Sequence, residues 1–318
     1  MAQDRTSMLV KVARMYHEQG LRQPEIAEQL HLSQSRISRL LKEAVERGVV
    51  RTVVVTPPGS HVDLELAVRD AYGLADVVVV SPSSNDPGAI LAALGSAGAV
   101  YLESTLMPGE RIGLSSWSAS LMAVVESMSP RVARGAERVV QILGGVGNTS
   151  VQVQATRMID TLARATGGTA MHFPAPGVVA SKQVRDALLA DSSMAEVVAG
   201  WSDLTVALVG IGSVNPSPML ASSGNSLPSD DLDALRGLGA VGDVCLNFFD
   251  DDGDAVSSGL HDRILGIDAA SLRAVPRKIA VAGGPSKVEA ICAAARGRWF
   301  DVLITDTDTA QAMAGQGS

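Results

Sequence analysis

The chain has 318 residues, 26 of them basic and 34 acidic, with a formal net charge of −8 and a hydrophobic fraction of 46%. This hydrophobic fraction excludes global disorder, and the length predicts two domains or one large domain with a small one. No run of 18 or more apolar residues occurs, so we expect no membrane-spanning segment.

The charges are unevenly distributed along the chain. Residues 1–60 hold nine Lys and Arg against six Asp and Glu, whereas the remainder holds 17 basic and 28 acidic residues. A basic N-terminal segment attached to an acidic body fits a small DNA-contacting domain joined to a larger domain with another task.

Two cysteines, Cys245 and Cys292, are too few for a disulfide framework. With no signal-like N-terminus, they indicate a reducing, cytoplasmic setting. We expect each cysteine to be a small buried apolar residue rather than a reactive thiol or a metal ligand.

The stretch Gln23–Arg47 predicts two helices separated by a tight turn, after a first helix over Met8–Gln19 that ends at Gly20. Pro24 suits the first turn of the second helix, and Ser33 can cap the third. Apolar residues recur at helical spacing along the third helix. They are Ile37, Leu40, Leu41, Ala44 and Val45.

The outer face of the third helix is polar and cationic. A short helix, a turn and a longer helix with such a face can enter the DNA major groove, where Arg reads guanine and Gln reads adenine. The alternative is a pair of amphipathic helices without a DNA role. The turn position usually held by Gly is His31, which predicts a slightly altered turn. The candidate DNA-binding residues are Gln23, Gln34, Ser35, Arg36, Ser38, Arg39 and Lys42.

The run Val49–Val55 predicts a strand, which indicates a winged helix-turn-helix. Thr56–Ser60 (TPPGS) is typical of a linker. We therefore predict a winged DNA-binding domain over residues 1–56 and an effector-binding and oligomerisation domain over residues 57–318.

Beyond the linker, apolar β-branched runs alternate with amphipathic helices, the pattern of an α/β, Rossmann-like parallel sheet covered on both faces. The expected strands are 75–80, 110–114, 137–143, 169–173, 204–210, 240–249, 261–267, 278–284 and 300–306. The expected helices are 61–71, 87–106, one ending at 128, 151–166, 181–189, 194–200 and 286–296. Glycine-rich loops follow several strands, at 144–147, 210–213 and 283–284, where ligands bind in open sheets.

The loop Ile112–Leu121 (IGLSSWSASL) follows a strand and opens a helix. Its hydroxyls and the helix N-terminal amides can cradle an anion or a polyol, and Trp117 can wall the pocket. The alternative is a serine-rich cap with a core Trp. The loop lacks the Gly-Lys-Ser/Thr of a Walker sequence, so nucleotide hydrolysis is not expected. The candidates are Ser115, Ser116, Trp117, Ser118 and Ser120, with Gly144 and Gly145 from the next strand-end loop.

Two further residues complete the candidate effector site. Asp243 lies inside an apolar run, where it either binds ligand hydroxyls or caps a neighbouring backbone. Lys287 follows Gly283–Gly284 and either neutralises a phosphate or is a surface lysine. The acidic run Asp250–Asp254 lacks the later Glu of a calcium loop and predicts a solvated hairpin turn. The histidines show neither a catalytic set nor metal spacing, so we expect no catalytic residue, metal or cofactor.

Together these motifs resemble the SorC family of bacterial transcriptional regulators. The resemblance covers residues 8–315 in order. It is carried by the N-terminal helix-turn-helix and by Ile112–Leu121, Pro174–Ser181, Leu208–Ser213, Gly239–Asp250, Asp262–Ile267, Ala280–Ile291 and Val302–Ala310.

The resemblance implies an N-terminal DNA-binding domain and a C-terminal sugar-binding domain of the sugar-phosphate isomerase and CoA-transferase type that works as a sensor. It implies tetramers that bind operators near catabolic operons and respond to sugars, polyols or their phosphates. The family's phosphate loop falls on Ser116–Ser120, its acidic residue on Asp243 and its GGxxK lysine on Lys287. The Ser-Trp-Ser sequence departs from the usual Gly- and Thr-rich loop, which leaves a phosphorylated ligand and a free polyol both open.

We therefore expect a non-enzymatic, cytoplasmic regulator, dimeric or tetrameric, whose partners are operator DNA and a sugar, polyol or sugar phosphate. One helix-turn-helix contacts too few base pairs for genomic specificity, so at least a dimer is needed. The alternatives are a sugar-phosphate isomerase with a DNA-binding head and Asp243 as its base, and a DNA-binding protein whose body serves only oligomerisation.

Overall fold

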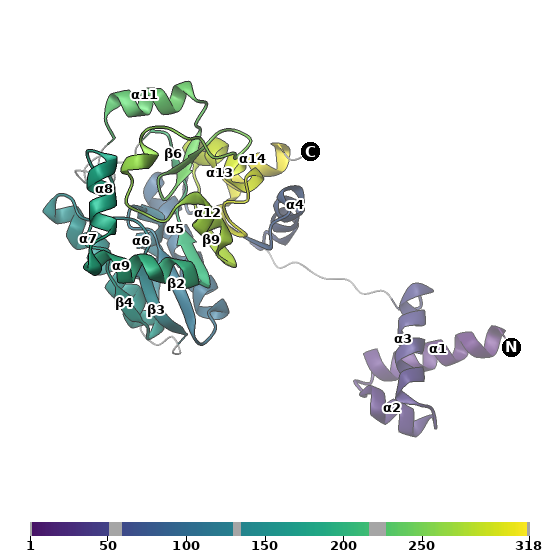
Figure 1. Ribbon diagram of the computed structural model, residues 1–318. Helices are drawn as coiled ribbons and strands as arrows, with labels where there is room; N and C mark the ends of the chain where they lie inside the picture. The colour runs from purple at the N-terminus through teal and green to yellow at the C-terminus, as the bar shows by residue number, and fades with distance from the viewer. Residues whose placement is uncertain (1, 51–58, 130–134, 216–226, 317–318) are drawn as a thin grey trace. The chain divides into compact units, whose positions relative to one another are not determined.

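A computed structural model describes residues 2–50, 59–129, 135–215 and 227–316 (Figure 1). Contacts divide the chain into two compact units, residues 1–60 and 61–318. Within the described ranges, no helix is both long and apolar enough to cross a membrane.

The N-terminal unit is a three-helix helix-turn-helix, formed by α1 (Ala2–His17), α2 (Gln23–Gln29) and α3 (Gln34–Glu46). The first helix begins six residues before the predicted Met8. The helices bury one small apolar core, and the residues that α2 and α3 contribute recur at helical spacing. The core includes Leu9, Val12, Ile26, Ala27, Ile37, Leu40 and Ala44.

The turn between α2 and α3 places His31 at a φ of 52°, in the left-handed region that Gly usually occupies. His31 therefore adopts the conformation that Gly usually supplies, and the predicted alteration of the turn is not seen at this residue. Ser33 is the residue that precedes α3, as predicted, but its hydroxyl does not cap the helix. It is hydrogen-bonded to the Ser35 hydroxyl at 3.1 Å instead. Val49 and Val50 form no strand, and the rest of the predicted wing lies outside the described residues.

The larger unit contains a seven-stranded parallel sheet in the order β1-β10-β9-β5-β2-β3-β4. Its strands coincide with the predicted apolar runs. They are β1 (Asp76–Val80), β2 (Glu110–Leu114), β3 (Ala136–Gln141), β4 (Thr169–Met171), β5 (Val206–Val209), β9 (Arg277–Val281) and β10 (Val302–Asp306).

Helices cover both faces of this sheet, as the buried runs require. One face packs against α5 (Pro87–Thr105), α6 (Ala119–Ser127) and α7 (Thr149–Thr166). The other packs against α4 (Val62–Tyr72), α9 (Ser192–Ala199), α12 (Ala269–Ala274), α13 (Val288–Arg296) and α14 (Thr307–Gln316). The helix α8 (Lys182–Leu189) precedes α9, and the 3-10 turn η1 (Gly200–Asp203) follows it.

The helix that follows the linker, α4, lies beside β1 and α14 (Figure 1). Glu65 Oε1 accepts the Val79 backbone N–H at 2.9 Å, and Asp76 Oδ1 accepts that of Val77 at 2.9 Å. These carboxylates occupy N–H groups of the edge strand that could otherwise pair with another chain. The first helix of the larger unit is thus fixed to the sheet.

A small antiparallel sheet lies beyond the main one and is formed by β6 (Gly212–Ser213), β7 (Gly242–Val244) and β8 (Asn247–Phe249). The predicted single strand 240–249 is therefore wrong, because the chain reverses at Cys245–Leu246. The predicted strand 261–267 is also wrong. That segment forms the 3-10 turn η2 (His261–Arg263) and isolated bridges at Ile264 and Gly266.

The helix α11 (Ser229–Gly237) lies at the end of the domain shown at the top of Figure 1. Its side chains share a third apolar core with the small sheet, including Leu235, Leu246 and Phe248. Neither α11 nor the short helices α12 and α14 were predicted from the sequence.

Candidate functional site

The main sheet has a point where the chain changes direction. β2 and β5 are neighbours, yet the chain continues from β2 to β3 on one side and from β5 to β9 on the other. The loops that leave β2 and β5 therefore meet at one edge. A Cβ on Gly210 would lie 2.4 Å from Ser118 Oγ, so the two loops touch. Open α/β sheets bind ligands at such switch points.

The loop after β2 leads directly into α6. Ser118 precedes the helix, and its Oγ accepts the Leu121 backbone N–H at 3.3 Å. The Ser120 hydroxyl lies 3.4 Å from that of Ser118. Both residues are buried. The structure thus places two of the predicted hydroxyls beside the N-terminal end of a helix, where an anion is stabilised.

Ser116 and Trp117 turn away from this cluster toward the loop after β3. Ser116 Oγ donates to the Leu143 carbonyl at 2.9 Å, and Trp117 Nε1 donates to the Gly144 carbonyl at 2.7 Å. Trp117 is 9% exposed and belongs to the third apolar core. Of the two interpretations of Trp117, the structure therefore favours the core residue over the pocket wall.

Gly144 and Gly145 are required by packing between loops. A Cβ on Gly144 would lie 2.2 Å from the Pro176 carbonyl oxygen. A Cβ on Gly145 would lie 2.5 Å from the side-chain nitrogen of Gln141. Close packing therefore explains why both positions are glycine, without any contact to a ligand.

Asp243 lies on β7 opposite Gly212 of β6. Its Oδ2 accepts the Leu246 backbone N–H at 2.9 Å, so the residue does cap a neighbouring backbone. Its Oδ1 faces Gly212, where a Cβ would lie 2.0 Å away. Burial raises the pKa of Asp243 to about 6, against the opposing effects of the Leu246 N–H and of the positive charge of Lys287.

Lys287 ends the 3-10 turn η3 (Pro285–Lys287) and is half-buried, so it is not a simple surface lysine. Burial lowers its pKa, and the charge of Asp243 acts in the opposite direction. The loop before it is held by Asp306, whose Oδ2 accepts the Gly284 N–H at 2.7 Å and the Thr309 hydroxyl at 2.7 Å. The lysine therefore stands on a fixed loop and interacts electrostatically with Asp243.

Cys245 also lies at this site, although it was predicted only as a buried apolar residue. Its thiol lies near the Ser115 side chain and near the charge of Asp243. Burial raises the pKa of the thiol to about 12, so it stays protonated at neutral pH. The structure thus brings Ser115, Asp243, Cys245 and Lys287 together, and loops after β2, β5 and β9 all contribute to the site.

Other predicted features lie elsewhere. A hollow of about 510 Å³ beside β4 is lined in part by Arg138, His172 and Glu196, and by none of the candidate effector residues. The run Asp250–Asp254 forms a tight turn in which the Asp250 N–H donates to the Asp254 carbonyl at 3.0 Å. In the part of the chain that the structure describes, no group of three metal-ligating side chains occurs.

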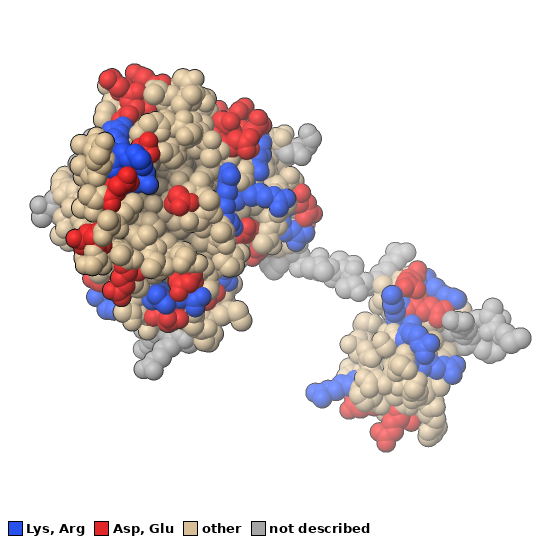
Figure 2. Space-filling model, viewed as in Figure 1, with Lys and Arg blue, Asp and Glu red and all other residues tan. Residues whose placement is uncertain are grey.

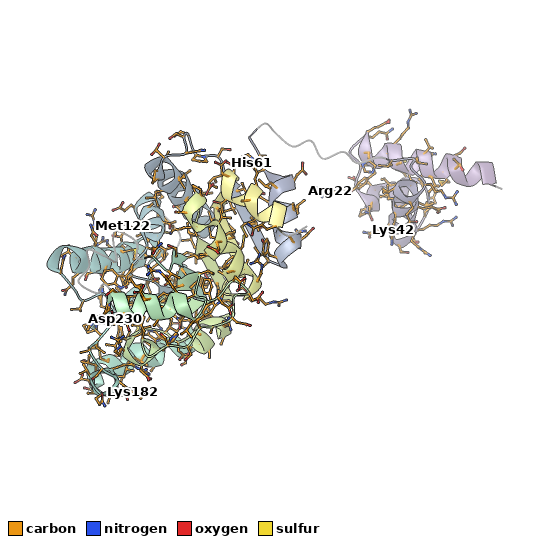
Figure 3. All side chains as sticks on the ribbon, turned by 90° about the horizontal axis from the view of Figure 1, so that it is seen from above. Arg22, Lys42, His61, Met122, Lys182 and Asp230 are labelled. Atoms are coloured by element: carbon orange, nitrogen blue, oxygen red, sulfur yellow. The ribbon has the colours of Figure 1, made fainter. Side chains whose placement is uncertain are left out.

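Six of the seven predicted DNA-contacting residues lie exposed on one helix, α3. Gln34, Ser35, Arg36, Ser38, Arg39 and Lys42 are all exposed on α3, and Gln23 is half-buried at the start of α2. Lys42 projects from the N-terminal unit in Figure 3. Figure 2 shows that the larger unit carries acidic patches, one of them over α11 with Asp230, Asp231 and Asp233. A cationic face on α3 is what the DNA backbone attracts.

Comparison with known proteins agrees with this architecture. Residues 56–314 match the Sugar-bind family of sugar-binding domains, and residues 10–47 match region 4 of sigma-70. The deoxyribonucleoside regulator of Bacillus subtilis is 31% identical over 98% of this chain and 99% of its own. The sorbitol operon regulator of Klebsiella pneumoniae is 30% identical over 97% and 98%. The crystal structure of full-length SorC from K. pneumoniae superimposes with a TM-score of 0.74 at 28% identity, covering 98% and 99%.

The chain belongs to the SorC family. It is a transcriptional regulator with a helix-turn-helix and a sugar-binding domain. The similar proteins are named as regulators, and this gives the isomerase alternative no support.

Two residues near the site of this SorC-family regulator were not predicted. Cys245 had no local signal beyond an apolar strand. Gln141 is the last residue of β3. In the sequence, its role was indicated only by its polar side chain within the apolar run 137–143. The place of both residues near the site depends on contacts between segments that are distant in the sequence.

Proposed function

We propose that this protein binds operator DNA through α3 and that a sugar, polyol or sugar phosphate, bound at the switch point of the sheet, controls that binding. The observation that carries the proposal is the convergence of Ser115 from the loop after β2, Asp243 from β7 and Lys287 from the loop after β9.

Each residue has a role that its chemistry supports. Asp243 Oδ1 has no hydrogen bond within the described residues and can accept a ligand hydroxyl. Ser115 and Ser118 offer hydroxyls, and the first amides of α6 can donate to an anionic oxygen. Lys287 supplies a positive charge that suits a phosphate. Ser116, Trp117, Gly144 and Gly145 shape the loops rather than touch the ligand.

The DNA contacts follow from the exposed face of α3. Arg36 and Arg39 would contact guanine edges or phosphates, Gln34 would contact adenine, and Lys42 would contact the backbone. At least two copies of the chain are needed to read two operator half-sites, so we propose a homodimer or homotetramer that acts in the cytoplasm.

A thermal-shift screen tests the effector site directly. The relatives named for sorbitol and deoxyribonucleosides suggest the panel: sorbitol, erythritol, 2-deoxyribose, sorbitol 6-phosphate, 2-deoxyribose 5-phosphate and inorganic phosphate. A ligand that binds the native state at 100 times its Kd stabilises it by about 2.7 kcal/mol, so its effect on Tm is measurable. The same compound should change operator affinity in a binding assay. A panel that leaves both Tm and operator affinity unchanged would contradict the proposal.

A further inference from the structure

The side chain of Gln141 lies at the centre of a buried polar network beneath the effector loop. Its Nε2 donates to Ser116 Oγ and to the Leu143 carbonyl, both at 2.9 Å. Its Oε1 accepts the Phe173 backbone N–H at 3.0 Å. The residue is 4% exposed. Both the nitrogen and the oxygen of the side-chain amide therefore form hydrogen bonds within the protein.

These partners belong to different loops. Ser116 follows β2, Leu143 follows β3 and Phe173 follows β4, so a single side chain joins three strand ends. Ser116 Oγ in turn donates to the Leu143 carbonyl at 2.9 Å, which closes a ring of hydrogen bonds. Hydrogen bonds within such a buried network strengthen one another. The network holds one arrangement, because a buried polar group without a partner is costly.

The surroundings are shaped for this amide. Gly145 leaves room for the side-chain nitrogen, since a Cβ there would lie 2.5 Å from it. The backbone carbonyl of Gln141 accepts Trp201 Nε1 at 3.0 Å, which fixes the end of β3 from the other face of the sheet. The backbone and side chain of Gln141 are thus both held in place.

We propose that Gln141 is a positioning residue for effector binding. Its amide holds Ser116, and through Ser116 it fixes the neighbouring Ser115 and Ser118 in the geometry that receives the ligand. This inference rests on the proposed function of the switch-point site. It assigns no contact between Gln141 and the ligand.

The chemistry of the amide suggests two variants. Gln141→Glu keeps an oxygen that can accept the Phe173 N–H but loses both donors to Ser116 and Leu143. Gln141→Met is similar in volume and removes every side-chain hydrogen bond. A matched control is Thr166→Val, which deletes another fully buried hydrogen bond, from Thr166 Oγ1 to the Leu162 carbonyl at 2.8 Å within α7.

The first measurement is amide hydrogen exchange of the full-length protein without ligand. We expect exchange of residues 115–119 to rise about tenfold in both Gln141 variants, because a lost hydrogen bond of about 1.4 kcal/mol corresponds to that factor. The Thr166→Val protein should match the wild type in this segment. Unchanged exchange of residues 115–119 in Gln141→Met would overturn the proposal, whatever the effector is.

The second measurement separates positioning from general stability. With sorbitol 6-phosphate and 2-deoxyribose 5-phosphate as probes, the concentration for half-maximal response should rise about tenfold in the Gln141 variants. Operator affinity without ligand should stay at the wild-type value. Equal weakening of operator binding in the absence of ligand would overturn the positioning role. If neither probe affects the wild type while loop exchange still rises in the variants, the positioning of the loop is supported and the proposed effector class is contradicted.

Discussion

The two carboxylate oxygens of Asp243 have different surroundings. The turn after it places Cys245 and Leu246 at φ values of 54° and 61°, which are costly for residues other than Gly. Asp243 Oδ2 holds the Leu246 N–H, and Asn247 Nδ2 donates to the carbonyls of Val244 and Ile267 at 3.1 and 3.0 Å. These bonds offset the strain of the turn, and Asp243 Oδ1 faces Gly212.

The raised pKa of Asp243 predicts a pH-dependent stability. The folded-state pKa of about 6 exceeds the ordinary 3.8, so the folded state binds the proton more tightly and the wild type loses stability as pH rises from about 4 to about 6. Asp243→Asn cannot ionise and keeps an oxygen for the Leu246 N–H. It should be more stable than the wild type at pH 7 by about 1–2 kcal/mol, after allowance for solvent screening.

Denaturant unfolding of both proteins at pH 4 and pH 7 checks this expectation. The difference in the free energy of unfolding should be much smaller at pH 4, where Asp243 is protonated in the folded state and about half protonated in the unfolded state. A difference that is the same at both pH values would show that the pKa of the Asp243 carboxyl is the same in the folded and unfolded states.

His31 gives a second prediction at the residue scale. Because its φ of 52° suits Gly, His31→Gly should be more stable than His31→Ala by about 1 kcal/mol. His31 is exposed, so neither variant removes core packing. Thermal unfolding of the two variants measures the difference. Equal stability would mean that the turn relaxes out of the left-handed conformation.

At the scale of elements, periodicity predicted the seven strands of the main sheet and most of the helices that cover it. It was wrong at 240–249, where the apolar residues continue through the β7–β8 turn without the Asn-Gly or Asp-Gly pair that marks such hairpins. Side chains at Asp243 and Asn247 stabilise that turn instead. Hydrogen bonds between side chains and distant backbone have no periodic signature, so the single-strand prediction could not detect them.

The candidate site was predicted in part for the same reason. Ser118, Asp243 and Lys287 follow strands or lie in apolar runs, and the sheet brings such positions together. The partner of Ser116 lies 27 residues away in the sequence, and so does that of Trp117. Their use in fixing loops therefore depends on the tertiary structure alone.

The third helix of the N-terminal unit yields a prediction for DNA binding. Arg36→Ala removes an exposed guanidinium from α3 and should weaken operator binding about tenfold or more, with a smaller dependence on salt. The matched control is Lys11→Ala, which removes an exposed positive charge from α1. Fluorescence anisotropy on an operator fragment at two salt concentrations compares them. If the two variants weaken binding equally, α3 is not the reading helix.

At the scale of the whole molecule, the chain joins a basic helix-turn-helix to an acidic sugar-binding domain, within a total net charge of −8. The acidic body is repelled by DNA phosphates, which favours contact through the N-terminal unit. Control by a ligand then requires that the ligand bind two states of the protein with different affinity. By linkage, the factor by which the ligand changes operator affinity equals the factor by which the operator changes ligand affinity. Both affinities can be measured on one protein.

Lys287→Ala tests this coupling most directly. The matched control is Lys182→Ala, which removes an exposed lysine on α8 that pairs with Asp186 and Asp262 (Figure 3). Operator affinity is measured by anisotropy with and without the phosphorylated compound that shifts the wild-type Tm. We expect Lys287→Ala to bind the operator with wild-type affinity and to need at least about tenfold more effector, while Lys182→Ala responds normally. A wild-type response in Lys287→Ala would contradict the account.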